Sequence, residues 1–175
     1  MFDSTKKPCK ASDNKLYDNQ IIIRKIKENE MEELYKLYLH FPIDPKHMLK
    51  ISREKHNKIW ERIKNNPCVN YFVADADEKI VGTCILTITP SIFRGGDGYA
   101  VIEHVVTHSD YRRRGIARAM MEYAIKYAWE HGCTEILLLS GVNFKGAHKL
   151  YESLGFDQSR RKGFILDRPG LKPMT

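Results

Sequence analysis

The segment from Tyr99 to Ala117 constrains the fold of this chain more than any other. It begins with strand-like residues 99–107, passes through a turn that contains three consecutive arginines, and reaches Gly115 at the start of a long helical pattern over 115–131. A helix leaves the N–H groups of its first turn unpaired, and the helix dipole makes that end positive. The segment therefore predicts an anion-binding site at the turn between the strand and the helix.

Strand and helix patterns elsewhere follow an order that predicts a mixed sheet with helices on both faces, an α/β (mixed α+β) fold. Residues 77–79 form a polar turn, so the strands on either side of it should make a hairpin. We expect residues 1–20 to be a flexible N-terminal leader and residues 21–175 to be one domain. The expected strands are 21–23, 69–76, 80–88, 99–107, 135–140, 156–158 and 163–166, and the expected helices are 30–39, 48–63, 115–131 and 145–154.

Composition narrows the class of protein further. The 175 residues are 42% hydrophobic and 29% charged, ordinary values for a globular domain. There is no apolar run long enough to cross a membrane and no secretory pattern at the start, so we expect a cytoplasmic protein without a membrane partner. Four widely separated cysteines argue against a disulfide framework and against a metal site. The net charge of +7 is scattered and lacks an aromatic-interleaved basic motif, so we expect no nucleic-acid partner.

The turn carries the one strong concentration of charge. Arg112–Arg114 and Arg118 place four arginines in seven positions, and guanidinium groups bind phosphate well. Gly115 has no side chain and Ala117 a small one, so a ligand can approach the backbone closely. The glycine spacing of ATP and dinucleotide motifs is absent. The turn alone leaves two interpretations, a pyrophosphate site and a helix start beside solvent-facing arginines.

The residues around the turn carry a family resemblance. Arg112 to Ala117 resembles the Arg/Gln-x-x-Gly-x-Gly/Ala signature of GNAT N-acetyltransferases, which bind acetyl-CoA. Residues 101–107 and 135–140 resemble that superfamily's central and next strands, and 147–156 is similar to its Ala-x-x-Leu-Tyr-x-x-x-Gly-Phe ending. The resemblance implies the GNAT fold, with a mixed, mostly antiparallel twisted sheet of about six to seven strands and about four helices.

The same resemblance implies acetyl-CoA as the cosubstrate and no metal. Backbone N–H groups from Arg113 to Arg118 would hold the pyrophosphate, and Val105 and Val106 would pair with the pantetheine arm. The Val105 N–H would face the thioester carbonyl and stabilise the oxyanion. Asn143 lies one place before the position where the family often has an asparagine. The implied cofactor-binding residues are Val105, Val106, Thr107, Arg112, Arg113, Arg114, Gly115, Ile116, Ala117, Arg118 and Asn143.

Two residues are candidates for catalysis by resemblance. Tyr151 matches the family tyrosine that protonates the departing thiolate, a task that suits a phenol. It also lies on an apolar helix stripe, so core packing is the alternative. Glu103 is similar to the glutamate that meets the substrate amine or holds a water for its proton, and a solvent-facing strand residue is the alternative. His104 and His108 are secondary candidates for a base.

Strand alternation predicts which residues share a face with Glu103. It places Glu103, Val105 and Thr107 on one face of the strand, and Ile102, His104 and Val106 on the other.

The implied function is transfer of an acetyl group from acetyl-CoA to a primary amine of a small molecule, by direct attack in a ternary complex. A protein or peptide acceptor, ribosomal ones included, and a non-catalytic acyl-CoA-binding module remain open alternatives. In this fold residues 29–66 and 90–98 would build much of the acceptor pocket. Tyr35, Tyr38, Arg94 and Asp97 are candidate contacts there. Dimerisation is common in the family, and a homodimer stays open.

Overall fold

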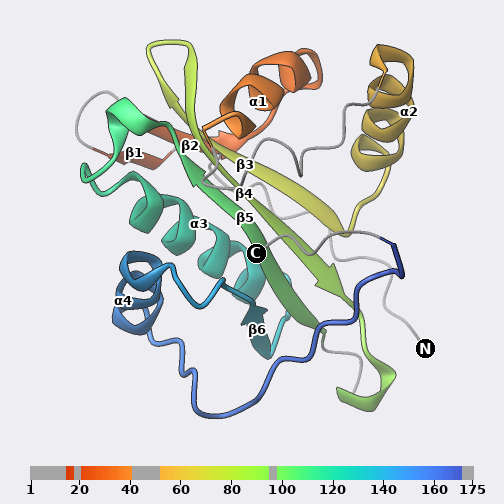
Figure 1. The fold of residues 1–175 in the computed structure, drawn as a ribbon, viewed down its shortest axis with the longest axis vertical. Helices are drawn as coiled ribbons and strands as arrows, with labels where there is room; N and C mark the ends of the chain where they lie inside the picture. The colour runs from red at the N-terminus through yellow and green to blue at the C-terminus, as the bar shows by residue number, and fades with distance from the viewer. Residues whose placement is uncertain (1–14, 18–20, 41–51, 95–97, 171–175) are drawn as a thin grey trace.

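The computed structural model describes residues 15–17, 21–40, 52–94 and 98–170. Within these ranges it contains one sheet, four α-helices and three short 3-10 turns (Figure 1). The strands are β1 (Lys15–Tyr17), β2 (Ile21–Lys25), β3 (Val69–Ala76), β4 (Lys79–Thr89), β5 (Tyr99–Thr107) and β6 (Glu135–Leu138). The helices are α1 (Met31–Tyr38), α2 (Arg53–Lys64), α3 (Ile116–Glu130) and α4 (Lys145–Ser153), and the 3-10 turns are η1 (Glu28–Glu30), η3 (Ile92–Arg94) and η4 (Ser109–Tyr111).

The sheet has six strands in the order β1-β2-β3-β4-β5-β6. Every neighbouring pair is antiparallel except β5 and β6, which run parallel. A parallel pair needs a crossover connection, and α3 supplies it. The predicted mixed, mostly antiparallel sheet with four helices is therefore confirmed, and so is the hairpin around residues 77–79.

Two apolar clusters cover the two faces of this sheet. The larger joins the α3 side chains Met120, Met121 and Ala124 to strand residues such as Phe72 and Ile102, all at most 1% exposed. The smaller joins Leu37 of α1 to Val73, Ile80 and Val106 on the other face. Helices α3 and α1 thus lie on opposite sides of the sheet, with β4 and β5 between them.

Strand β5 contains a β-bulge that overturns the predicted alternation. Glu103 pairs with Ile85 and Val106 pairs with Thr83, so one residue of β4 lies opposite two residues of β5. His104, one of the two, has a φ of +50°. The extra residue shifts the pleat by one position, as a bulge does.

The side chains beyond the bulge consequently change face. Ile102 and Val105 pack into the cluster around α3, whereas Val106 packs into the cluster around α1. The ring of His104 lies 6.0 Å from that of Tyr38 in α1, measured between centroids. The prediction that His104 and Val106 share a face with Ile102 is wrong, and so is the prediction that Val105 shares a face with Glu103, because period-two alternation assumes an unbulged strand.

Strand β5 also loses its other neighbour at the same level. Its parallel pairing with β6 covers only Tyr99 to Ile102, opposite Glu135 to Leu138. From Glu103 to Thr107 the β6 side of β5 has no strand partner within the described chain. This half of β5 is the segment that leads into the arginine-rich turn.

Some predicted elements differ from those in the structure, and one predicted boundary lies outside the described residues. The strands predicted at 156–158 and 163–166 are wrong: residues 156–170 contain no strand and run outside the sheet (Figure 1). Phe164, Ile165 and Leu166 are 91%, 78% and 98% exposed, because no strand lies beside them to pair with. Residues 15–17, which lie within the predicted leader 1–20, form β1 and pair with β2. The predicted start of the second helix, 48–51, lies outside the described residues.

A buried ion-pair triad ties the start of α1 to the sheet. The Arg24 guanidinium donates to Glu30 at 2.7 Å and to Asp75 at 2.6 Å, and the three side chains are only 10–13% exposed. Burial is the largest single influence and acts to raise the pKa of Glu30, but the hydrogen bonds from Arg24 and from the Lys27 N–H, together with the charges of both residues, leave this pKa lowered. The triad therefore favours the ionised form of Glu30 in a partly dry position and places two carboxyl groups beside one guanidinium.

We expect Arg24→Met to lower the free energy of unfolding by about 3–5 kcal/mol, because it strands two buried carboxylates. Urea unfolding at pH 7 measures this. Lys58→Ala is the control: it removes an ion pair with Glu54 in which both side chains are more than 70% exposed, so it should cost at most about 0.5 kcal/mol. An equal effect of the two variants would contradict this role of Arg24.

Candidate active site

The turn between β5 and α3 presents a row of unpaired backbone donors. The His108 ring accepts from the N–H of Asp110 and so caps η4, after which Arg113 (φ +65°) and Gly115 (φ +78°) both adopt left-handed conformations. The first backbone bond of α3 runs from Ala119 N–H to Gly115 carbonyl. The N–H groups of Arg113 to Arg118 make no backbone hydrogen bond within the described chain. Such a concave row of N–H groups at a helix start binds anions.

The four arginines of this turn divide by what their side chains do. Arg112 donates to the carbonyls of Thr107 (3.2 Å) and His40 (2.9 Å), so it braces the turn against the end of α1. Arg114 donates to the Asp110 carbonyl and lies over the Tyr111 ring. Arg118 donates to the Ser153 hydroxyl at 2.5 Å. Arg113 is exposed and has no side-chain partner among the described residues, so its guanidinium is available to a ligand.

Two of the predicted cofactor-binding residues have buried side chains. Ile116 and Val106 are each 2% exposed and lie in the two core clusters. Their contribution to a ligand is limited to backbone groups. Gly115 is exposed, and a Cβ added there would meet nothing within 4 Å, so the helix start is open to solvent. Thr107 has a buried hydroxyl without a hydrogen-bond partner within the described chain.

The Arg118–Ser153 hydrogen bond brings α4, and with it Tyr151, next to the turn. Tyr151 packs against the larger core cluster and makes an edge contact with Phe156, with ring centroids 6.2 Å apart. Burial, and to a smaller extent the thiol of Cys84, raises the pKa of Tyr151. Cys84 is the β4 residue opposite the bulge. The phenol therefore stays protonated at neutral pH and lies near the part of β5 that has lost its strand partner.

The side chains of Glu103, which belongs to β5, and Tyr151 lie on opposite faces of the sheet. Glu103 is exposed on the face that carries α1. Burial of Tyr71 is the main cause of its raised pKa, and the charge of Glu103 is the smaller one. Tyr151 belongs with the cluster on the α3 face. A carboxylate and a protonated phenol thus lie on either side of one open strand, where the first can accept a proton and the second can donate one.

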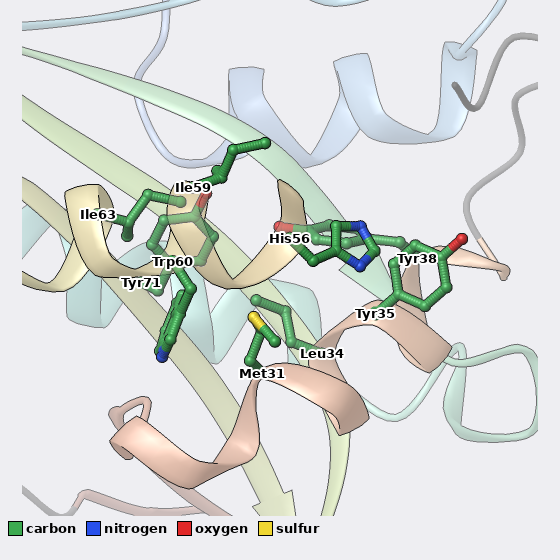
Figure 2. Close-up of a pocket in the computed structure, with 9 residues that line it drawn as sticks. All are labelled: Met31, Leu34, Tyr35, Tyr38, His56, Ile59, Trp60, Ile63 and Tyr71. Atoms are coloured by element: carbon green, nitrogen blue, oxygen red, sulfur yellow. The ribbon is translucent and has the colours of Figure 1, made fainter. Parts of the chain in front are cut away.

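The remaining predicted site residues lie at the edges of this arrangement. Asn143 is exposed in the connection between β6 and α4, where its carbonyl accepts from Lys145 N–H. Tyr35 and Tyr38 line a cavity of about 150 Å³ between α1 and α2 (Figure 2). His56, Ile59 and Trp60 of the same cavity lie within the range 29–66 expected to build the acceptor pocket, but the sequence did not single them out. Tyr71 comes from β3, and no sequence signal pointed to it. Arg94 lies in η3, and Asp97 lies outside the described residues.

No helix among residues 15–17, 21–40, 52–94 and 98–170 is both long and apolar enough to cross a bilayer. In the same ranges no three His, Cys, Asp or Glu side chains gather where they could hold a metal ion.

Comparison with known proteins identifies the class to which this fold and site belong. The family model described as the Acetyltransferase (GNAT) family matches residues 29–156. The chain belongs to the GNAT acetyltransferase family. The match includes both helices of the cavity, β5, the arginine-rich turn and Tyr151.

Individual relatives are more distant. The chain is 30% identical over 97 residues to N-acetyltransferase 8 of Homo sapiens, a match that covers 55% of this chain and 42% of that protein. It is 39% identical over 92 residues to the N-alpha-acetyltransferase MAK3 of Arabidopsis thaliana, covering 51% of this chain and 46% of that protein. The chain thus spans less than half the length of these two curated relatives. The fold resembles an aminoglycoside N-acetyltransferase solved with CoA, with TM-score 0.68, 21% identity, and coverage of 85% and 95% of the two chains.

We expect Arg113→Ala to weaken CoA binding about 10- to 100-fold, because a hydrogen bond to a charged group contributes roughly 1.5–3 kcal/mol. Its melting temperature should stay that of the wild type, because the side chain has no partner to lose. Titration calorimetry measures the affinity. Arg53→Ala, which removes the same charge from the exposed start of α2, is the control. Wild-type affinity in Arg113→Ala would refute this assignment.

The pH dependence of stability should report on His108. Burial, together with His40, whose ring lies 3.9 Å away between centroids, lowers the pKa of His108. The unfolded chain then binds this proton more readily than the folded chain, so stability falls as pH drops below about 6.5. Thermal melts at pH 5.5 and 7.5 should show a smaller pH effect in His108→Gln than in the wild type. An unchanged difference would contradict the assignment.

Proposed function

We propose that this protein transfers the acetyl group of acetyl-CoA to a primary amine of a small-molecule acceptor. The observation that supports this most strongly is the joint geometry of β5 and the turn. The side of β5 that lacks a β6 partner from Glu103 to Thr107 is followed, after η4, by the unpaired N–H groups of Arg113 to Arg118. An extended amide-bearing arm that ends in a pyrophosphate fits such a path.

The residues of the turn would bind the cosubstrate in distinct ways. The N–H groups of Arg113 to Arg118 would donate to the pyrophosphate oxygens, with the Arg113 guanidinium adding a charged donor. Val105, Val106 and Thr107 would offer backbone groups to the pantetheine arm along the open side of β5. Asn143, at the end of β6, would flank the same path. Arg112 and Arg114 act by holding the shape of the turn through carbonyl groups.

The chemical step is direct attack in a ternary complex. The amine nitrogen forms a bond to the thioester carbonyl carbon, and the carbon–sulfur bond then breaks. Glu103, directly or through a water, takes the proton that the amine loses. The Val105 N–H stabilises the oxyanion, and Tyr151 gives its proton to the departing thiolate. The raised pKa of Tyr151 suits a group that must hold its proton until the thiolate forms.

A peptide N-terminus is the second candidate acceptor. The observation in its favour is the 39% identity to an N-alpha-acetyltransferase, which covers 51% of this chain. A non-catalytic acyl-CoA-binding module would keep the turn but would have no use for Glu103 and Tyr151 on opposite sides of β5. Release of free thiol from acetyl-CoA in the presence of an amine panel separates the enzyme from the binding module.

We expect Tyr151→Phe to lower kcat about 10²- to 10⁴-fold, the usual contribution of a general acid, with an unchanged affinity for CoA. Thiol release under saturating acetyl-CoA measures kcat. Tyr123→Phe is the matched control, because Tyr123 packs against the same core from α3. Equal kcat in wild type and Tyr151→Phe would remove the acid role of Tyr151, and no turnover in either would favour the binding module.

A further inference from the structure

The cavity between α1 and α2 has a wall of one chemical kind. Its volume is about 150 Å³. Figure 2 shows α1 and α2 supplying its sides, with Tyr71 coming from β3. No Asp, Glu, Lys or Arg is among the residues that line it, which are Met31, Leu34, Tyr35, Tyr38, His56, Ile59, Trp60, Ile63 and Tyr71. A group bound there would meet aliphatic and aromatic surface, which favours an uncharged apolar group.

This cavity reaches the catalytic strand through two of its tyrosines. Tyr71 makes an edge contact with Trp60, with centroids 6.1 Å apart, and the charge of Glu103 contributes to raising its pKa. Tyr38 lies beside His104 at the bulge of β5. The carboxylate of Glu103 and the apolar cavity therefore belong to the same face of the sheet and to neighbouring positions on it.

Tyr38 adds one polar feature to the wall. Its hydroxyl is buried, and the Thr83 side chain acts on it as a hydrogen-bond partner. Burial raises the pKa of Tyr38, so the hydroxyl keeps its proton and remains a donor.

We propose that the acceptor is an α-amino compound with a large apolar side chain, and that the cavity binds this side chain while Glu103 meets the amine. The inference rests on the acetyl transfer proposed above and assigns its acceptor class. A free amino-acid derivative and the first residue of a peptide share this chemistry. Polycationic amines and phosphorylated sugars lack an apolar group to fill the cavity and find no countercharge on its wall.

The first test compares acceptors in the thiol-release assay with the full chain. Glycinamide, leucinamide and phenylalaninamide vary the side chain alone, and spermidine and glucosamine 6-phosphate represent the other classes. We expect kcat/KM for leucinamide to exceed that for glycinamide at least about 10-fold, since even one methylene in an apolar pocket gives about 10- to 200-fold. Tetrapeptides that begin with Leu or Gly distinguish the two sources. The same preference confined to the peptides supports the inference with a peptide acceptor.

A pair of variants on α2 tests the cavity itself. Ile59→Asp places a carboxylate on the wall at a side chain that is 37% exposed, so the helix should tolerate it. We expect kcat/KM for leucinamide to fall about 10-fold or more and that for glycinamide to stay within about twofold. Asn57→Asp adds the same charge at an exposed position of α2 that does not line the cavity, and it should change neither value. Unchanged CoA affinity confirms that both variants are folded.

A binding measurement keeps the inference independent of turnover. Trp60 lines the cavity and is one of two tryptophans in the chain, so its fluorescence should report occupancy. We expect N-acetylleucinamide to change this fluorescence saturably, N-acetylglycinamide not to, and Ile59→Asp to abolish the change. Turnover or binding without a preference for the apolar side chain, or equal losses for both amides in Ile59→Asp, would overturn the inference. Absence of turnover together with selective binding would count against the acetyl transfer only.

Discussion

Near Glu103, strand β5 loses its pairing with β6 and its regular register with β4. The rest of the site depends on this interruption. Pairing with β6 stops at Ile102, and the register with β4 skips at His104 and Val105. Backbone groups in the middle of a sheet are normally consumed by the ladder, because leaving them unpaired is costly. Here the release is confined to the stretch that leads into the turn. A family that binds an extended, amide-bearing cosubstrate needs such a stretch, and the bulge also turns Glu103 and Val105 to opposite faces.

The turn converts this opening into an anion site by shape more than by charge. Of its four arginines, three have their guanidinium groups bound to carbonyl or hydroxyl oxygens of the protein. Arg113 and Gly115, which lie among these braced residues, adopt left-handed conformations, a backbone pattern found in anion-binding turns. The Arg118–Ser153 bond extends these contacts to α4, the helix that carries Tyr151. The proposed pyrophosphate site and the proposed acid therefore belong to one connected set of contacts.

Local patterns predicted the parts of this structure that local physics determines. The strand, turn and helix from Tyr99 onward, the hairpin and the element order all follow from periodicity and turn residues. The bulge was not predictable in this way, because a histidine, unlike a glycine, does not by itself indicate a positive φ at position 104. The predicted C-terminal strands failed because apolar residues such as Phe164 indicate strand propensity and not the presence of a partner strand. The cavity escaped prediction because it forms between two helices and Tyr71, whose contact is tertiary.

Amide hydrogen exchange of the wild-type chain, with and without CoA, tests most directly whether β5 and the arginine-rich turn bind the cosubstrate. Protection should appear in the peptides that contain Val105–Thr107 and Arg113–Arg118, because their N–H groups gain acceptors from the ligand. The distant β2–β3 pairing should be unaffected. Binding of CoA without protection of the Arg113–Arg118 amides would contradict the central claim, since the ligand would then be held by some other part of the molecule.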